Sequence, residues 1–267
     1  MKELLKNIIK PIYLFLTNRN LRVFYWLLNK EQFVPRHKTV KDLKFLNYKF
    51  DVPDLRSFVW QFKDIFVDQI YKLKFDDCNP LIFDCGANIG TSCIYFKKEY
   101  PNSKIIAFEG DIKIAEILLS NLKKNNIFDI EVINKLVWTD DLSVNFKPDG
   151  ADGGSIDKTK SSNLTKSIRL KTYLDLKSSI DLLKIDIEGA ECEVLKDCRD
   201  SLTHVKNIFI EYHSIKNQNQ NLSIILNILE DNGFRYYIED LHKRKTPFID
   251  KGINLNMDLQ LNIFAFK

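Results

Sequence analysis

Two carboxylates stand at the end of a hydrophobic run that begins at Leu182. Asp186 and Glu188 close this run and are followed by Gly189. Their i, i+2 spacing places both side chains on one face if the strand continues through them. Like charges held this close raise the pKa of one carboxyl, which suits a general base or a metal site. The alternative is structural, with the pair capping the next helix and holding Lys184.

A glycine-punctuated turn follows an earlier buried run, at residues 84–90. Gly86 lets the backbone turn sharply and approach a ligand, and Gly90 lets the next helix pack close to the sheet. Asn88 stands where a dinucleotide-binding fold often has glycine, and asparagine tolerates a left-handed backbone. Such a turn brings backbone N–H groups and a helix N-terminus against a nucleotide-like ligand.

Two acidic residues narrow the choice of that ligand. Asp84, at the lip of the turn, would repel the pyrophosphate of NAD and attract the ammonium of a methionine group. Glu109 comes about 20 residues after the turn, where an acidic side chain pairs with ribose hydroxyls. Free ribose hydroxyls occur in S-adenosylmethionine and in NAD, so Glu109 excludes only a 2′-phosphorylated ligand. Helix capping is the alternative role for Glu109.

Parallel strands are the elements that would position all of these residues. From residue 79 onward, apolar runs alternate with amphipathic segments, which predicts an α/β fold with a mostly parallel sheet covered on both faces. Ligands bind beyond the carboxyl ends of strands in such a sheet. Strands are predicted at 81–84, 104–109, 130–138, 182–187, 208–213, 234–238 and near 259–266. Helices are predicted at 88–99, 112–125, 190–197 and 221–231.

Residues 1–75 are predicted to form a helical extension over a core in residues 76–267. Asp54 is a candidate N-cap for a helix of this extension. Residues 1–30 mix apolar side chains with Lys and Arg, and no apolar run approaches the ~20 residues of a membrane-spanning helix. This segment either packs on the core or on a second subunit, or rests on an anionic membrane surface as a basic amphipathic segment.

Composition limits the cellular compartment and the binding partners that we expect. The chain has 40 Lys and Arg against 36 Asp and Glu, a net charge of +4 that is too mild to indicate a nucleic-acid partner. Its five cysteines lack CxxC or zinc-type spacing, and no signal-peptide cleavage site follows the N-terminal segment. We therefore expect a reduced, cytoplasmic setting, peripheral to the membrane if the N-terminal segment docks there. The oligomeric state is open, and a homo-oligomer is one alternative.

Three motifs, in this order and at these distances, resemble the FkbM-type methyltransferase family. They are Asp84-x-Gly86-x-Asn88-x-Gly90, Phe108-Glu109 and Leu183-Lys184-Ile185-Asp186-Ile187-Glu188-Gly189-Ala190-Glu191. The last string is highly specific, whereas the first is shared with many methyltransferases. The resemblance covers residues 79 to about 214, and Asn121, Asn134 and residues 153–156 also match the pattern.

The resemblance implies a class I methyltransferase fold, which is a Rossmann-like, seven-stranded, mostly parallel sheet with helices on both faces. It also implies S-adenosylmethionine as cofactor and methyl transfer to a hydroxyl oxygen. The acceptors of such enzymes are commonly sugars in polysaccharides, glycolipids or glycosylated metabolites. We therefore expect a hydroxyl-bearing small molecule or glycan as the partner. The implied cofactor-binding residues are Asp84, Gly86, Asn88, Ile89, Gly90, Ser92, Glu109 and Asn134.

A hydroxyl acceptor needs its proton removed as it attacks the methyl group, so the site needs a general base. The candidates are Glu188, Asp186 and His213, the last of which ends the predicted strand 208–213. His213 can equally be a hydrogen-bonded structural residue. A further hypothesis comes from metal-dependent sugar O-methyltransferases, which this edge resembles. Asp186, Glu211 and His213 would then ligate a Mg²⁺-like ion, with Glu188 as base.

The sequence leaves alternative functions open. A methyltransferase-fold protein acting on a non-sugar metabolite has the same motifs, and so does a module that only binds. A nicotinamide oxidoreductase would share the fold and Glu109, but Asp84 and the Asp186–Glu188 edge fit it poorly.

Residues 149–155 either close over the substrate or form a hairpin turn between strands near 144–146 and 168–170.

Overall fold

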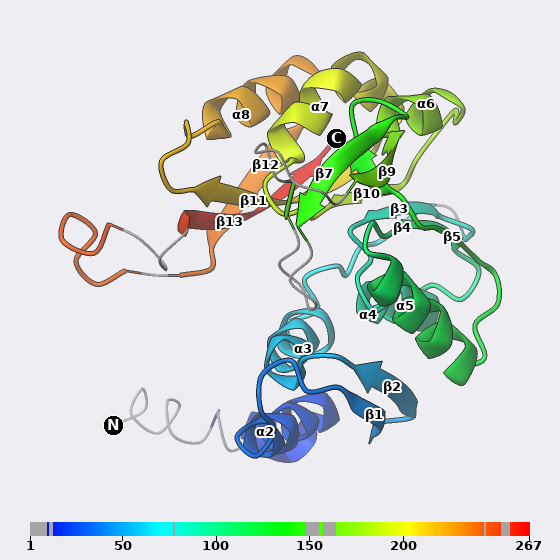
Figure 1. The fold of residues 1–267 in the computed structure, drawn as a ribbon, viewed down its shortest axis with the longest axis vertical. Coiled ribbons are helices and arrows are strands. Elements are labelled where there is room, and N and C mark those ends of the chain that lie inside the picture. The colour runs from blue at the N-terminus through cyan, green and yellow to red at the C-terminus, as the bar shows by residue number, and fades with distance from the viewer. Residues whose placement is uncertain are drawn as a thin grey trace.

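A seven-stranded sheet forms the centre of the protein in the computed structural model (Figure 1). The strand order is β12-β13-β11-β10-β3-β4-β5, and within this sheet only β13 runs antiparallel to its neighbours. This confirms the predicted mostly parallel α/β fold. The strands are β3 Leu81–Cys85, β4 Lys104–Phe108, β5 Ile130–Ile133, β10 Leu182–Ile185, β11 Asn207–Ile215, β12 Arg235–Asp240 and β13 Met257–Phe266. The structure describes residues 10, 13–76, 78–147, 155–156, 164–242, 244–251 and 257–267.

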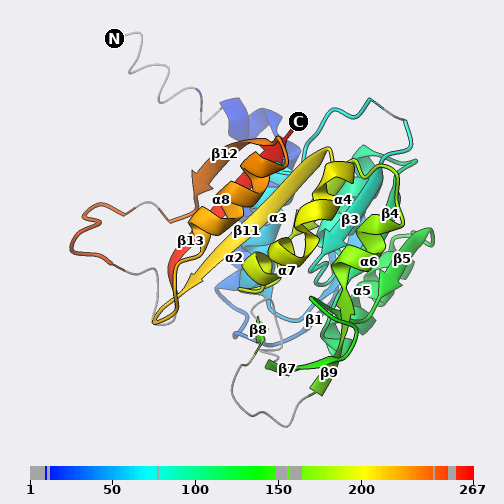
Figure 2. The same cartoon turned by 90° about the horizontal axis from the view of Figure 1, so that it is seen from above.

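Helices cover both faces of this sheet, as Figures 1 and 2 show. On one face lie α4 (Thr91–Glu99) and α5 (Ile112–Lys124), and on the other α6 (Leu170–Asp175), α7 (Glu191–Cys198) and α8 (Leu222–Asp231). Strand β10 is buried along its whole length, which is why its sequence is apolar except for Lys184. The short helix α6 was not predicted from the sequence.

A smaller sheet lies beside the large one. Its strands are β6 (Leu136–Trp138), β7 (Ser143–Lys147), β8 (Ser155–Ile156) and β9 (Leu164–Arg169), in the order β6-β9-β7-β8. The predicted strand 130–138 is therefore two strands in two sheets, since the chain turns between β5 and β6. Strands β7 and β9 pair antiparallel, as the hairpin alternative expects. Most of the loop 149–155 lies outside the described residues.

The N-terminal segment is helical only in part. It contains α2 (Arg19–Glu31), α3 (Leu55–Phe62) and the π-helical turn η1 (Lys63–Val67). Between α2 and α3 the chain forms a hairpin of β1 (Val40–Phe45) and β2 (Tyr48–Val52), which corrects the helical prediction for this stretch. The predicted cap is confirmed, because the Asp54 side chain accepts a hydrogen bond from the Arg56 N–H. None of the helices within the described residues is long and apolar enough to cross a membrane.

Aromatic and amide contacts join this segment to the sheet. The ring of Tyr71 meets Phe209 of β11 edge to face, with centroids 4.9 Å apart. Asn121 of α5 is fully buried; its Oδ1 accepts from the Asp51 N–H at 2.7 Å, and its Nδ2 donates to the carbonyls of Asp51 and Ile89. The amide thus ties the hairpin to α5 and to the glycine turn. These contacts hold the segment beside the carboxyl ends of the strands.

Candidate active site

A cleft of about 770 Å³ lies beyond the carboxyl ends of β3, β4, β10 and β11. Four parts of the chain form its walls: the N-terminal segment, the strand ends with the loops that follow them, β6 with β7, and β12 with β13. The predicted site residues that line this cleft are Gly86, Asn88, Ser92, Glu109, Asp186, Glu188 and Glu211. The predicted site residues that lie behind its walls are Asp84, Ile89, Gly90, Asn134 and His213.

The glycine turn (residues 84–90) contacts the acidic edge, residues 186–188 after β10, at Gly86. The residue has a φ of 82°, and a Cβ added to it would lie 1.8 Å from the carbonyl oxygen of Asp186. No side chain fits in that space, so glycine is required both for the backbone conformation and for the close approach. Asn88 has a φ of 49°, which confirms the predicted left-handed asparagine.

Asp84 does not face the cleft, contrary to its predicted contact with the cofactor ammonium. Its side chain is 0% exposed, and one carboxylate oxygen accepts from the Ser92 Oγ at 2.5 Å. The other oxygen lies 3.1 Å from the Nζ of Lys184. A buried carboxylate is stable only with such partners, and its role here is to hold the cation and the start of α4 behind the turn.

Lys184 connects the two predicted motifs. Its Nζ donates to the Gly86 carbonyl at 2.9 Å and lies 3.5 Å from Asp186. Burial lowers the pKa of this lysine, but the charges of Asp84 and Asp186 outweigh burial and hold that pKa well above its usual value. The lysine is therefore cationic and fixes the position of Asp186 relative to the turn.

Glu109 follows β4 and faces the cleft, as the cofactor prediction requires. Its two carboxylate oxygens accept from the N–H groups of Asn88 (2.9 Å) and Asp111 (2.8 Å). Burial raises the pKa of this carboxyl to about 7, although these hydrogen bonds act in the opposite direction. Each oxygen keeps a lone pair for a hydroxyl donor in the cleft.

The remaining predicted cofactor residues support the cleft from behind. Gly90, with a φ of 86°, caps α4 and packs near Leu118, which agrees with the close helix packing expected of it. Ile89 is buried, and its carbonyl accepts from Asn121. Asn134 is exposed after β5, and its Nδ2 donates to the Glu109 carbonyl at 2.8 Å. Asn134 therefore positions the loop that carries Glu109.

The acidic edge begins where β10 ends, at Ile185. Strand geometry does not continue through Asp186 and Glu188, because Glu188 adopts a left-handed φ of 56°. Such a conformation is costly for a residue with a side chain and is typical of functional sites. It turns the Glu188 carboxylate into the cleft, where its side chain is 28% exposed.

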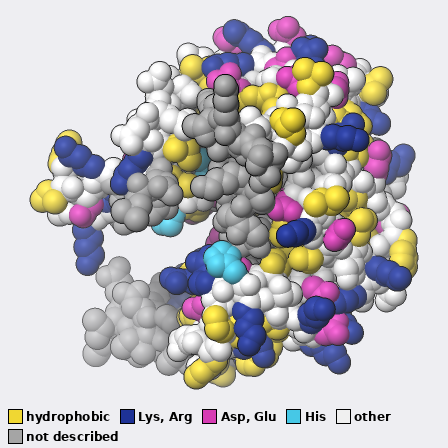
Figure 3. All heavy atoms as spheres, viewed as in Figure 1, with side chains coloured by type: hydrophobic (Ala, Val, Ile, Leu, Met, Phe, Trp, Pro, Cys, Tyr) yellow, Lys and Arg dark blue, Asp and Glu magenta, His cyan; other side chains and the backbone are white. Residues whose placement is uncertain are grey.

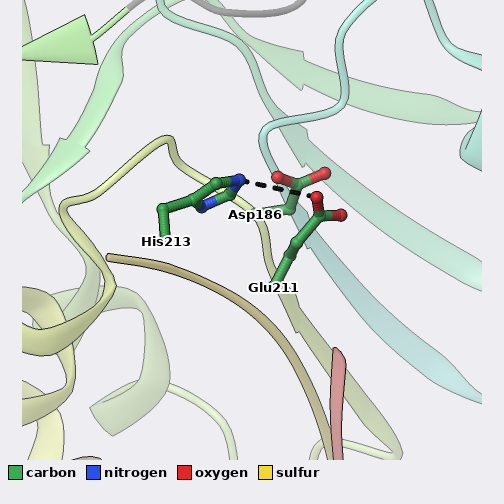
Figure 4. Close-up of side chains that lie close together, drawn as sticks. All are labelled: Asp186, Glu211 and His213. Atoms are coloured by element: carbon green, nitrogen blue, oxygen red, sulfur yellow. Dashed lines mark ion pairs between the residues drawn. The ribbon is translucent and has the colours of Figure 1, made fainter. Parts of the chain in front are cut away.

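His213 lies within β11, two residues before its end at Ile215, and is held by carboxylates on both sides. Its Nδ1 lies 3.0 Å from Glu191, the first residue of α7, and its Nε2 lies 3.5 Å from Glu211 and 3.6 Å from Glu188. Figure 4 shows Asp186, Glu211 and His213 converging. One ligand atom from each of these three residues lies within 4.8 Å of the others, so the three share one face of the edge.

The ionisable side chains of this edge are largely buried, and burial shifts their pKa values. Burial and the charge of Glu211 raise the pKa of Asp186 to about 7, and burial raises the pKa of Glu188 well above its usual value. Burial would lower the pKa of His213, but the surrounding carboxylates, Glu191 first, hold that pKa well above its usual value. Four carboxyl groups (Asp186, Glu188, Glu191 and Glu211) lie near two cations (Lys184 and His213), and a cationic ligand would stabilise the ionised form of these carboxyl groups.

Several cleft residues carry no sequence signal. Trp60, Asp64 and Tyr71 come from α3, η1 and the stretch after η1, and they enter the cleft only because the N-terminal segment folds back over the sheet. Asn262 of β13 pairs in register with Glu211, and its buried Oδ1 has no hydrogen-bond partner among the described residues. The insertion of β13 beside β11 creates this contact, and nothing in the local sequence predicts it.

Comparisons with known proteins bear on this site. The family model "Methyltransferase FkbM domain" matches residues 84–236. Methyltransferase sdnD of Sordaria araneosa is 29% identical over 212 residues, which cover 65% of this chain and 80% of that protein. The 2-O-methyltransferase NoeI of Sinorhizobium fredii is 26% identical over 160 residues, which cover 50% of this chain and 63% of that protein.

Among solved structures, the methyltransferase FkbM from Methylobacillus flagellatus is 16% identical, with 96% of this chain and 60% of that chain covered and a TM-score of 0.49. The family match is the decisive comparison. It spans more than half of the chain and contains the glycine turn, Glu109 and the acidic edge. The chain therefore belongs to the FkbM methyltransferase domain family and is a methyltransferase.

Proposed function

We propose that this protein transfers a methyl group from S-adenosylmethionine to a hydroxyl oxygen, and that the acceptor is a sugar. The observation that carries the proposal is the placement of Glu188, a carboxylate turned into the cleft directly beside the glycine turn. A hydroxyl is a poor nucleophile until it loses its proton, whereas a thiolate acceptor has no proton for a carboxylate to remove.

The residues present fit the cofactor. S-adenosylmethionine supplies an electrophilic methyl group on a sulfonium. Gly86 lines the cleft with backbone alone, and the free lone pairs of Glu109 suit ribose hydroxyls. Ser92 and the N-terminus of α4 line the same wall, where a carboxylate is favoured. The excess negative charge of the acidic edge suits the positive charge of the cofactor.

Glu188 is the base in this proposal, and His213 positions it. Asp186 and Glu188 line the cleft but His213 does not, so the histidine cannot meet a substrate directly. Its Nε2 faces Glu188 while Glu191 holds its other ring nitrogen. Asp186 is held by the buried Lys184, whereas the left-handed backbone turns Glu188 into the cleft, so we assign the proton transfer to Glu188.

The acceptor side of the cleft fits a polyhydroxylated molecule. Trp60 offers an exposed ring on which a sugar face can pack, and Asp64 and Asp240 offer hydrogen-bond acceptors. The relative NoeI is named a 2-O-methyltransferase, which supports oxygen as the methylated atom.

A divalent cation at the acidic edge is a further part of the proposal. Asp186, Glu211 and His213 would hold the ion, with the Nε2 proton of His213 released on binding, and Glu191 orients the histidine as carboxylates commonly do in metal sites. The ion would polarise the acceptor oxygen. The cluster fits because its carboxylates outnumber its cations, and the orphaned Oδ1 of Asn262 lies beside Glu211 in register.

The decisive experiment measures cofactor binding and turnover separately. Calorimetry should show binding of S-adenosylmethionine and none of NAD, and candidate glycans should yield S-adenosylhomocysteine. Glu188→Gln should keep cofactor affinity and lower kcat by about 10²- to 10⁴-fold, because it removes only the base. The matched control is Glu239→Gln, which also alters a carboxylate lining the cleft, on β12. An unchanged kcat in Glu188→Gln would contradict the assigned base.

The cation has its own test. Exhaustive chelation should abolish turnover, and added Mg²⁺ or Mn²⁺ should restore it. Glu211→Gln should weaken Mg²⁺ binding in calorimetry, because it removes one of the three proposed ligands, while Glu239→Gln should leave Mg²⁺ binding unchanged. Full activity after chelation would rule out the metal and leave the rest of the proposal intact.

A further inference from the structure

Exposed apolar side chains gather at two separate places. The first, which we call the N-terminal patch, consists of Tyr13, Leu14, Phe15, Leu16, Tyr25, Trp26 and Phe33. The rings of Phe15 and Tyr25 are in edge contact, and Arg22 donates to the carbonyls of Phe15 and Leu16, so residues 13–16 fold back on α2. The second is the loop tip, residues 244–251 between β12 and β13, where Phe248 is 93% and Ile249 79% exposed.

Both places combine these apolar side chains with an excess of basic ones. Residues 13–33 contain three basic residues and one acidic residue, and residues 244–251 contain the same numbers. The ammonium of Lys30 lies 5.5 Å from the centre of the Trp26 ring. Aromatic rings beside Lys and Arg are the composition of surfaces that lie on anionic lipid headgroups.

The two places flank the mouth of the cleft. Trp60 of the cleft wall contacts Phe24 of α2, and Phe24 in turn contacts Tyr25 of the N-terminal patch. On the other side, Asp240, Leu241 and His242 line the cleft immediately before the loop tip. Figure 3 shows the surface hollowed between the protruding loop tip and the α2 end, with hydrophobic and basic side chains at both.

We propose that an anionic lipid bilayer docks on the N-terminal patch and the loop tip together, and that the acceptor is a lipid-anchored hydroxyl compound that enters the cleft between them. The charge of both places complements an anionic surface, and their placement presents the cleft mouth to it. The nature of the acceptor rests on the proposed methyl transfer, whereas the docking itself does not.

Vesicle flotation tests the docking. The protein should float with vesicles of equimolar phosphatidylglycerol and phosphatidylcholine, and not with phosphatidylcholine alone. High salt should weaken the binding because it screens the basic side chains. Arg244→Gln with Lys245→Gln should lower the partition coefficient about 30-fold, since two basic contacts are lost. Equal binding to neutral vesicles would overturn the electrostatic part, and no binding to either would overturn the proposal.

A matched pair of variants isolates the apolar part. Phe248→Ala should lower vesicle binding about tenfold or more. Phe128→Ala removes an equally large side chain, 75% exposed, beside β5 at the opposite edge of the sheet, and should change nothing. Both side chains are exposed, so neither change threatens folding. The alternative occupant is a second copy of this chain, and light scattering of the two variants tests it. Self-association that Phe248→Ala abolishes would overturn the proposal that a bilayer docks here.

Calorimetry with S-adenosylmethionine separates this proposal from the proposed function. All vesicle-binding variants should bind the cofactor like the wild type, since none of their substitutions lies in the cleft. Vesicle binding without cofactor binding would remove the methyl-transfer proposal and leave docking in place. On vesicles that carry a lipid-linked sugar, turnover should exceed that on the free sugar, and Phe248→Ala should remove that advantage. Equal turnover on both substrates would overturn the lipid-anchored acceptor.

Discussion

The carboxylates of this cleft do different work according to what surrounds each of them. Asp84 is buried with Lys184 and never meets the cleft, whereas Glu188 is turned into it by a left-handed backbone. Glu109 lies between these extremes, because it faces the cleft but is held by two backbone N–H groups. Residue type and spacing pointed to all three, but only their burial separates structural carboxylates from functional ones.

Glu109 gives a pH-dependent prediction. Its folded-state pKa of about 7 exceeds its ordinary value of 4.5, so ionising it costs the folded protein. Stability from this group is present below about pH 4.5 and is lost as the pH rises through about 7. Glu109→Gln should therefore be more stable than the wild type at pH 8, while its affinity for S-adenosylmethionine falls.

Urea unfolding of the cofactor-free proteins at pH 5 and pH 8 measures the first effect, and calorimetry measures the second. Glu116→Gln, at an exposed position on α5, is the control for removing an acid. If Glu109→Gln leaves the pH dependence of stability the same as in the wild type, the assignment of this loss to Glu109 is contradicted.

At the scale of elements, the turn after β3 and the end of β10 act as one unit. The contact of Gly86 with the Asp186 carbonyl and the bridge made by Lys184 join them. Neighbouring parallel strands bring the two loops together, which is why residues far apart in the chain form one site.

Two glycines allow this contact to be tested. Gly86 and Gly233 both have a left-handed φ, but a Cβ at Gly233 would meet nothing within 4 Å. Gly233→Ala should cost about 1–2 kcal/mol of unfolding free energy for the backbone conformation alone. Gly86→Ala should cost more and should abolish cofactor binding, because the added methyl displaces Asp186. Urea unfolding and calorimetry on both variants measure the difference, and equal effects would contradict the contact.

For the whole molecule, the sequence predicted the strand and helix order because apolar periodicity and glycine turns are local signals. It missed what depends on distant pairing. The hairpin β1–β2 does carry a local strand signal, because residues 48–52 alternate between apolar and polar side chains, but its place beside α5 depends on the distant Asn121. Trp60 and Asp64 reach the cleft through the folding back of the N-terminal segment, and Asn262 through strand register. The cofactor wall was therefore largely predictable, whereas the acceptor wall was not.

Asn121 provides a prediction at this scale, since one amide joins the hairpin, α5 and the cofactor turn. Asn121→Leu should lower the unfolding free energy by about 2–4 kcal/mol, because buried N–H and carbonyl groups lose their partners. It should also weaken cofactor binding through Ile89. Asn125→Leu, one turn later and only partly buried, removes bonds to Lys49 and should cost less and spare the cofactor. Urea unfolding with calorimetry compares the two.

The position of β13 between β11 and β12 has a consequence for biosynthesis. During translation β12 leaves the ribosome before β13, yet in the finished sheet its hydrogen-bonding partner is β13. Until β13 inserts, both β11 and β12 present open edges, and Glu211 lacks its neighbours Gln260 and Asn262. Methyl-transfer competence should therefore arise only after β13 has emerged, and the nascent chain before that moment is the form that chaperones must protect from edge-to-edge aggregation.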